Sequence, residues 1–156
     1  NIANPGCYAT SVLVPLLPLL ENNMIKNDNI IIDSKSGYSG AGKIKKTEDL
    51  KLEVDENIKT YGVGDHKHIA EINQEIKKAS KMNNSEVFFS ANLIPVERGI
   101  LSNIYINPIT GTSFDDVFSC LYNTYKSEKY IKILDHISLG HFSICWLFLY
   151  YQILII

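Results

Sequence analysis

The stretch TSVLVPLLPLL at residues 10–20 constrains the fold most, because it carries valine and leucine on nearly every side of a helix. A helix that is apolar all round has to be buried between other elements. We therefore predict a buried helix that begins at Thr10 or Ser11. Pro15 and Pro18 oppose a regular helix, since each removes a backbone donor and crowds the preceding turn. A kink, or two short helical segments, is expected.

The chain is large enough to build layers around such a helix. Its 156 residues are 46% hydrophobic, which is sufficient for one domain with a core. The formal net charge is −2, and no basic excess points to a nucleic-acid partner. The three cysteines are widely spaced and form no C-x-x-C pair, which favours neither a disulfide framework nor a zinc site. A reducing, cytoplasmic location is expected.

The remaining periodicity predicts an α/β domain. Strands are expected near residues 30, 88 and 104, helices over 69–81 and 113–134, and a polar loop with short elements over 44–65. Ser113, followed by two acidic residues, is the predicted N-cap of the later helix. We expect a mixed, largely antiparallel sheet with helices on one face.

The last residues differ in composition from everything before them. The segment GHFSICWLFLYYQILII, residues 140–156, is nearly as apolar as a transmembrane span but slightly short and without a basic flank. We expect a domain over 1–137 and an atypical tail over 138–156 that is foreign to the fold, as a frameshift would produce. A membrane helix, or a buried strand or helix, is the alternative.

Cys7, in the motif NPGCYATS, is the first candidate for chemistry. An unplaced cysteine is most often a buried small hydrophobe. Here a Pro-Gly turn precedes Cys7 and a helix follows, so backbone N–H groups and the helix dipole are aimed at the sulfur. Such a site favours a thiolate, the form that acts as a nucleophile.

A cysteine nucleophile needs a group that moves its proton, and His66 and His68 in GDHKHIAEI are the candidates. Both stand where a loop enters the helix predicted over 69–81. Alternate residues point in different directions, so we do not expect both imidazoles to face one thiolate. Solvated side chains beside Asp65, or metal ligands, are the alternatives. A third strong ligand is not evident nearby, so a metal site is not favoured.

Two further features invite a ligand interpretation. The loop GYSGAGK fits G-x-x-x-x-G-K, but Ile44 follows where a phosphate-binding loop needs Ser or Thr for magnesium. We reject that interpretation, although small residues there permit close backbone approach to a ligand. Arg98 is the only arginine, and its planar fork suits a carboxylate or phosphate. A surface ion pair explains Arg98 equally well.

Four motifs, in this order, resemble those of the N-acetyl-γ-glutamyl-phosphate reductases: NPGCYATS, DSKSGYSGAGK, HKHIAEINQEI and FSANLIPVERGILSNIYI. The resemblance runs from Asn1 to about Leu134. It implies a catalytic domain of the glyceraldehyde-3-phosphate dehydrogenase type, a cytoplasmic enzyme of arginine biosynthesis, and a homo-oligomer of the full-length protein. It implies neither a nucleic-acid partner nor a membrane.

The resemblance also implies a mechanism. Cys7 attacks the acyl phosphate of N-acetyl-glutamyl 5-phosphate, phosphate leaves, and NADPH reduces the thioester to the 5-semialdehyde. His68, or His66 as the second choice, moves the protons. Arg98 holds an anionic group of the substrate, and Ser39 and Gly40 lie near the nicotinamide end of NADP.

The chain departs from the reductases at both ends. The family carries most dinucleotide contacts on an N-terminal Rossmann domain, and this chain contains no G-x-G-x-x-G fingerprint. We therefore expect the catalytic and dimerisation half of a reductase, which alone binds NADP weakly or not at all. Two alternatives stay open: a cofactor-independent cysteine acyltransferase or hydrolase, and an inactive oligomerisation fragment.

Overall fold

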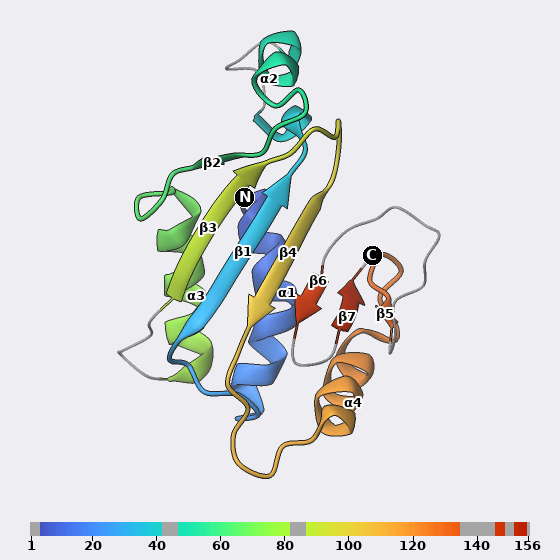
Figure 1. Cartoon of the computed structure of the whole chain (residues 1–156). Coiled ribbons are helices and arrows are strands. Elements are labelled where there is room, and N and C mark those ends of the chain that lie inside the picture. The colour runs from blue at the N-terminus through green and yellow to red at the C-terminus, as the bar shows by residue number, and fades with distance from the viewer. Residues whose placement is uncertain (1–3, 42–46, 82–86, 135–145, 149–151, 156) are drawn as a thin grey trace.

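The computed structural model describes residues 4–41, 47–81, 87–134, 146–148 and 152–155. Its centre is a four-stranded sheet in the order β2-β3-β1-β4 (Figure 1). The strands are β1 (Ile30–Ser36), β2 (Lys59–Tyr61), β3 (Val87–Leu93) and β4 (Ile100–Tyr105). β1 runs parallel to β3 and antiparallel to β4, and β2 runs antiparallel to β3. The predicted mixed, largely antiparallel sheet is confirmed, and so are the strands expected near residues 30, 88 and 104.

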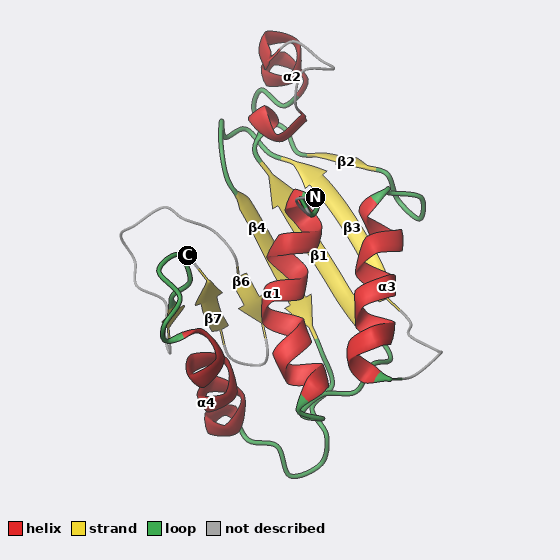
Figure 2. Ribbon diagram, turned by 180° about the vertical axis from the view of Figure 1, so that it is seen from behind, coloured by secondary structure: helices red, strands yellow, loops and turns green. Residues whose placement is uncertain are grey.

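Helices α1 (Cys7–Glu21) and α3 (His68–Ser80) cover one face of this sheet (Figure 2). Alternate residues of β1 are buried beneath them, including Ile30 and Ile32. Leu16 and Leu19 of α1 are completely buried. Burying each such side chain contributes about 1.5–3 kcal/mol. The core therefore lies between α1, α3 and the sheet, and the predicted placement of helices on one face is confirmed.

The helix α1 is one continuous element, so the expectation of two short segments is wrong, while that of a kink stays a prediction. Pro18 has no N–H to donate to the carbonyl of Val14, four residues earlier. The hydroxyl of Tyr125, on helix α4 (Phe114–Tyr125), donates to that carbonyl oxygen at 2.6 Å. A long-range partner thus replaces the hydrogen bond that the proline removes. α1 also begins at Cys7, before the predicted start at Thr10 or Ser11.

The boundaries of the other helices follow from their capping and periodicity. α3 confirms the helix predicted over 69–81 to within one residue. Ser113 caps α4 through a capping box with Asp116, as expected for an N-cap. The predicted extension to residue 134 is wrong, because α4 ends at Tyr125. Beyond it the residues that pack on the core, Ile131 and Ile133, are two positions apart, which suits extended chain rather than a helix.

The C-terminal part of the described chain forms strands. β5 (Ile133–Leu134), β6 (Trp146–Phe148) and β7 (Gln152–Ile155) make a second sheet in the order β5-β7-β6. The described residues of the tail are thus strands, and that the tail is foreign to the fold stays a prediction. Most of the segment 138–156 lies outside them. No described helix is long and apolar enough to cross a membrane.

A chain of buried hydroxyls fixes the first turns of α1 on the sheet. Ser102 of β4 contacts Ser11 of α1 at 2.8 Å and Ser34 of β1 at 2.7 Å, oxygen to oxygen. All three side chains are buried. Each hydroxyl has a partner, so none bears the cost of an unsatisfied buried polar group. The N-terminus of α1 is thereby held at the carboxyl ends of β1 and β3, where α/β sheets commonly bind ligands (Figure 1).

Candidate active site

Cys7 and His68 are the first residues of two helices that pack side by side, α1 and α3. Both helix N-termini lie at the same end of the sheet (Figure 2). The Cys7 side chain is exposed, and the His68 side chain is partly buried. A thiol at a helix N-terminus lies where the helix dipole favours negative charge. The predicted position of Cys7 at the mouth of a helix is therefore confirmed.

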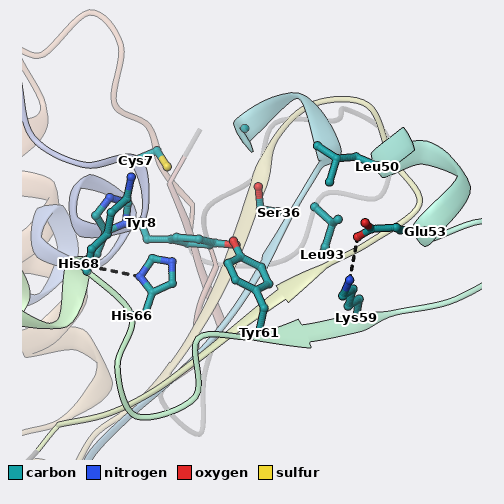
Figure 3. Close-up of a pocket in the computed structure, with 12 residues that line it drawn as sticks. Cys7, Tyr8, Ser36, Leu50, Glu53, Lys59, Tyr61, His66, His68 and Leu93 are labelled. Carbon is teal, nitrogen blue, oxygen red and sulfur yellow. Dashed lines mark hydrogen bonds and ion pairs between the residues drawn. The ribbon is translucent and has the colours of Figure 1, made fainter. Parts of the chain in front are cut away.

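A pocket of about 540 Å³ opens beside these two residues, and Figure 3 shows how its lining is divided. Cys7, His66 and His68 gather at one end. Leu50, Leu93, Lys59 and Glu53 gather at the other end, and Tyr8 lies between the two groups. The volume suits a small-molecule ligand. The pocket therefore joins a thiol and two imidazoles to a second, differently composed end.

Because Gly6 has no side chain, the imidazole of His68 can lie against the turn that carries Cys7. A Cβ built on Gly6 would overlap Nε2 and Cδ2 of His68, so only glycine fits there without displacing the ring. The Gly6 N–H donates to both carboxylate oxygens of Glu71, at 3.2 Å each. Glu71 follows His68 by three positions and lies on the same face of α3. These contacts tie the start of α1 to the first turn of α3.

His66 lies just outside α3, against aromatic rings. Its centroid is 5.4 Å from the ring of Tyr8, 5.2 Å from that of Phe89 and 5.6 Å from that of Tyr61. The rings of His66 and His68 are 4.9 Å apart, so both line the same pocket. The two side chains thus lie close together although their positions alternate, because the segment turns into a helix here. That only one imidazole faces the thiolate stays a prediction.

Burial sets the protonation of the imidazoles. Burial lowers the pKa of His68, with a further lowering from the Lys67 charge and an opposing rise from Glu71. Burial also lowers the pKa of His66, and the neighbouring charges of His68 and Lys67 act in the same direction. Desolvation penalises the charged imidazolium in both cases. Near neutral pH, both rings are therefore held in the neutral form that can accept a proton.

Two tyrosines form the middle of the pocket. The hydroxyls of Tyr8 and Tyr61 are 2.9 Å apart, and the ring of Tyr8 packs edge-on against the rings of His66 and His68. Burial raises the pKa of the Tyr8 hydroxyl, and the hydrogen bond with Tyr61 adds to that rise. Burial likewise raises the pKa of Tyr61. Both phenols therefore stay neutral and offer hydrogen bonds to a ligand in the pocket.

The second end of the pocket joins apolar surface to an ion pair. Leu50 and Leu93 are buried and belong to one small cluster. Nζ of Lys59 lies 2.8 Å from a carboxylate oxygen of Glu53, and both side chains are about a third or more exposed. An exposed pair of this kind holds its partners weakly. Lys59 is therefore available to an anionic group of a ligand.

The glycine-rich loop lies on the turn that carries Arg98. The N–H of Ser39 donates to the carbonyl of Glu97 at 3.0 Å. A Cβ on Gly37 would lie 2.8 Å from the backbone nitrogen of Arg98. Gly40 is exposed and lines the pocket. The Arg98 side chain is 83% exposed and pairs with Glu97. Neither Arg98 nor Ser39 is among the described residues that line the pocket.

The site also contains residues that sequence reasoning did not single out: Tyr8, Tyr61 and Glu71. Spacing could have found Glu71, because a residue three positions after His68 shares its helix face. Tyr8 directly follows Cys7. No local signal identifies Tyr61, whose contact with Tyr8 joins positions 53 residues apart. Within the described ranges, no group of three or more His, Cys, Asp or Glu could hold a metal ion.

Comparisons with known proteins agree on a family. A family model described as semialdehyde dehydrogenase, dimerisation domain, matches residues 7–144. The N-acetyl-gamma-glutamyl-phosphate reductases of Ehrlichia canis (strain Jake) and Ehrlichia ruminantium (strain Gardel) are 46% and 48% identical to the chain over 132 residues. These matches cover 85% of this chain and 38% of each relative.

A plant relative has the same function in its name. The probable N-acetyl-gamma-glutamyl-phosphate reductase, chloroplastic, of Arabidopsis thaliana is 42% identical over 134 residues. That match covers 86% of this chain and 33% of the relative. The chain thus spans 33–38% of the length of these curated relatives.

Proposed function

The chain belongs to the semialdehyde dehydrogenase family, whose dimerisation domain it contains, and we propose that it is the catalytic part of an N-acetyl-γ-glutamyl-phosphate reductase. The proposed enzyme converts N-acetyl-glutamyl 5-phosphate to the 5-semialdehyde through a thioester on Cys7, in arginine biosynthesis. The names of the relatives support the substrate. The observation that carries the chemistry is the imidazole of His68 against Gly6, the residue before Cys7, with both Cys7 and His68 lining one pocket.

In the proposed mechanism, neutral His68 accepts the proton of the Cys7 thiol. The thiolate attacks the carbonyl carbon of the acyl phosphate, the bond from carbon to the phosphate oxygen breaks, and inorganic phosphate leaves. A thioester remains on Cys7, which replaces one difficult step by two easier ones. After reduction of the carbonyl, the protonated His68 donates to the substrate oxygen. Loss of that proton again to His68 lets the C–S bond break and releases the aldehyde and the thiolate.

NADP is the proposed cofactor, and the loop around Gly40 fits its nicotinamide end. Gly40 lines the pocket without a side chain, and a Cβ there would lie 2.9 Å from Oγ of Ser36. Ser39 neighbours it on the same short helix, η1 (Tyr38–Ala41). When bound, NADPH supplies the hydride that reduces the thioester carbonyl. We propose that a Rossmann domain elsewhere in the full-length enzyme provides most of the dinucleotide contacts.

The substrate's charged group has two candidate partners. We keep Arg98 as one, because the turn that carries it is hydrogen-bonded to the loop containing Gly40. Lys59 is the other, because it lines the end of the pocket away from Cys7. Separate Arg98→Ala and Lys59→Ala variants of the full-length enzyme distinguish them by which one raises the substrate KM. If neither raises it, both assignments are wrong.

The open face of the four-stranded sheet supports association of two copies. Ile31 is the register partner of Phe88 on one side and of Tyr105 on the other. These side chains are 47%, 52% and 48% exposed and lie opposite α1 and α3 (Figure 1). We propose that this apolar strip is the homo-oligomer contact. Phe88→Lys is expected to shift the full-length enzyme to monomer in sedimentation, and an unchanged oligomer would refute the assignment.

A matched pair of cysteine variants tests the proposed function. Cys7→Ser in the full-length enzyme is expected to abolish NADPH oxidation by the acyl phosphate. Cys120→Ser changes a half-buried thiol on α4 and is expected to preserve it. Turnover by Cys7→Ser would overturn the assignment. Ester or amide cleavage by the wild-type chain without NADPH would favour the hydrolase alternative, and no turnover at all would favour the inactive fragment.

A further inference from the structure

His66 supplies two hydrogen-bond acceptors to the start of α3, although it lies outside the helix. Its ring atom Nδ1 accepts from the backbone N–H of His68 at 3.3 Å (Figure 3). Its carbonyl oxygen accepts from the N–H of Ile69 at 2.9 Å. These are two of the donors that a helix N-terminus leaves without partners. Lys67, at the N-cap position, has helical backbone angles and no capping side-chain bond.

Packing holds the ring of His66 in place. Tyr8, Tyr61 and Phe89 surround it, each with a centroid between 5.2 and 5.6 Å away. Gly62, with a φ of +59°, makes room, because a Cβ there would lie 3.0 Å from Cδ2 of His66. Three elements, α1, β2 and β3, therefore fix the ring that caps α3.

The ring of His68 lacks an equivalent anchor. Its Nδ1 is buried and has no hydrogen-bond partner among the residues that the structure describes. Its orientation therefore depends on where α3 begins and on contact with Gly6 and Tyr8. The position of α3's first residue depends in turn on the cap that His66 provides.

We propose that His66 is a positioning residue that acts through His68: as the neutral Nε2–H tautomer, it accepts the His68 N–H at Nδ1 and fixes the imidazole beside Cys7. This inference rests on the proposed function. The inference gives the two histidines different roles: His68 carries the proton, and His66 caps the helix that positions His68.

The surroundings favour the neutral ring that this role requires. Protonation would turn Nδ1 into a donor and break its bond with the His68 N–H. Burial lowers the pKa of His66, the charges of His68 and Lys67 lower it further, and Asp65 opposes them. The groups that face the ring from α1 and β2, Tyr8 and Tyr61, are neutral phenols. The cap is therefore kept near neutral pH and is lost in acid.

Two amide variants test the role in the full-length enzyme. Oδ1 of asparagine is bonded to Cγ, as Nδ1 of histidine is, so His66→Asn keeps the acceptor near its place. His66→Gln moves the acceptor one bond outward. We expect kcat to fall roughly 100-fold with Gln, the effect of misplacing a catalytic group. For His66→Asn we expect kcat to fall by much less than the roughly 10²–10⁴-fold that removal of a general acid–base group typically costs.

The pH profile of kcat/KM separates a positioning role of His66 from a role as the group that carries the proton. His66→Asn should keep the ionisation that limits activity in the parent enzyme, since His68 still carries the proton. Disappearance of that ionisation in His66→Asn, or equal losses in the two variants, would overturn the inference. Either result leaves the proposed thioester at Cys7 standing, because the Cys7→Ser variant and the adduct on Cys7 test that step separately.

A measurement on the unmutated enzyme does not depend on activity and needs a variant only to assign the signal of His66. Two-dimensional ¹⁵N–¹H spectra of histidine rings distinguish the two neutral tautomers. We expect His66, assigned by its absence from the His66→Asn spectrum, to be unprotonated at Nδ1 and protonated at Nε2. A proton on Nδ1 of His66 at neutral pH would contradict the proposal.

Discussion

Gly6 and His68 fit together so closely that the imidazole occupies the space where any other residue at position 6 would carry its Cβ. The contact joins the residue before Cys7 to the first residue of α3. Glycine is therefore required here by the ring and not by its backbone angles, since its φ of −65° suits any residue. The geometry of the proposed nucleophile and its proton acceptor depends on this contact.

Replacing Gly6 by alanine tests that dependence. We expect Gly6→Ala to destabilise the chain by about 1–3 kcal/mol, as overpacking does, and to lower kcat of the full-length enzyme about 100-fold by displacing His68. Denaturant unfolding and steady-state kinetics measure the two effects. In a His68→Ala background the same change should cost little stability, since the clashing ring is gone. An equal cost in both backgrounds would show that the clash lies elsewhere.

Glu71 provides a second test, through the pKa of His68. Burial lowers that pKa, and the Glu71 charge partly offsets the lowering. Glu71→Gln keeps an acceptor for the Gly6 N–H but removes the charge. We expect the ionisation of His68 in the pH profile of kcat/KM to move to lower pH, with the enzyme still folded. Movement to higher pH would contradict the geometry around Gly6.

The stability of the chain should depend on pH through the two histidines. Both have folded-state pKa values below their ordinary value of 6.5. As pH falls through 6.5, the unfolded chain takes up protons before the folded chain does, so the free energy of unfolding decreases. The decrease continues until the pH passes below the folded pKa values. His66→Asn and His68→Asn should each flatten this dependence in denaturant titrations, and an unchanged slope would contradict it.

Much of the fold could be predicted from the sequence because it depends on the local periodicity of apolar residues. The isoleucines of α3 recur at helical spacing, and the strands near residues 30, 88 and 104 are β-branched or aromatic runs. The continuity of α1 was not accessible in this way. The hydroxyl that replaces the bond lost at Pro18 belongs to Tyr125, and nothing in residues 10–20 indicates it.

The candidate site, likewise, could be predicted only in part. Cys7 and the two histidines stand out by residue type and by their place at the start of helices. The role of Gly6 could not be predicted, because its neighbour His68 is 62 positions later and is brought there by the packing of α1 on α3. Lys59 of the polar segment 44–65 was missed for a related reason: only the pairing of β2 with β3 brings it to the pocket.

The hydrogen bond that stabilises α1 at Pro18 gives a prediction about stability alone. Tyr125→Phe leaves the carbonyl of Val14 without its donor. We expect a loss of about 0.5–1.5 kcal/mol, the net contribution of a typical hydrogen bond, because this bond is only partly buried. In a Pro18→Ala background, the restored N–H can serve the same carbonyl, so Tyr125→Phe should cost much less. Calorimetric melting of the four proteins measures the coupling, and an additive result would contradict the compensation.

The covalent step at Cys7 is the central claim, and mass spectrometry of the digested enzyme tests it most directly. The full-length enzyme is mixed with N-acetyl-glutamyl 5-phosphate in the absence of NADPH, quenched in acid, and digested. We predict a single N-acetyl-glutamyl adduct on the peptide carrying Cys7, released by hydroxylamine and absent from Cys7→Ser. An enzyme that turns over but carries no adduct, or carries it on another residue, would contradict the account.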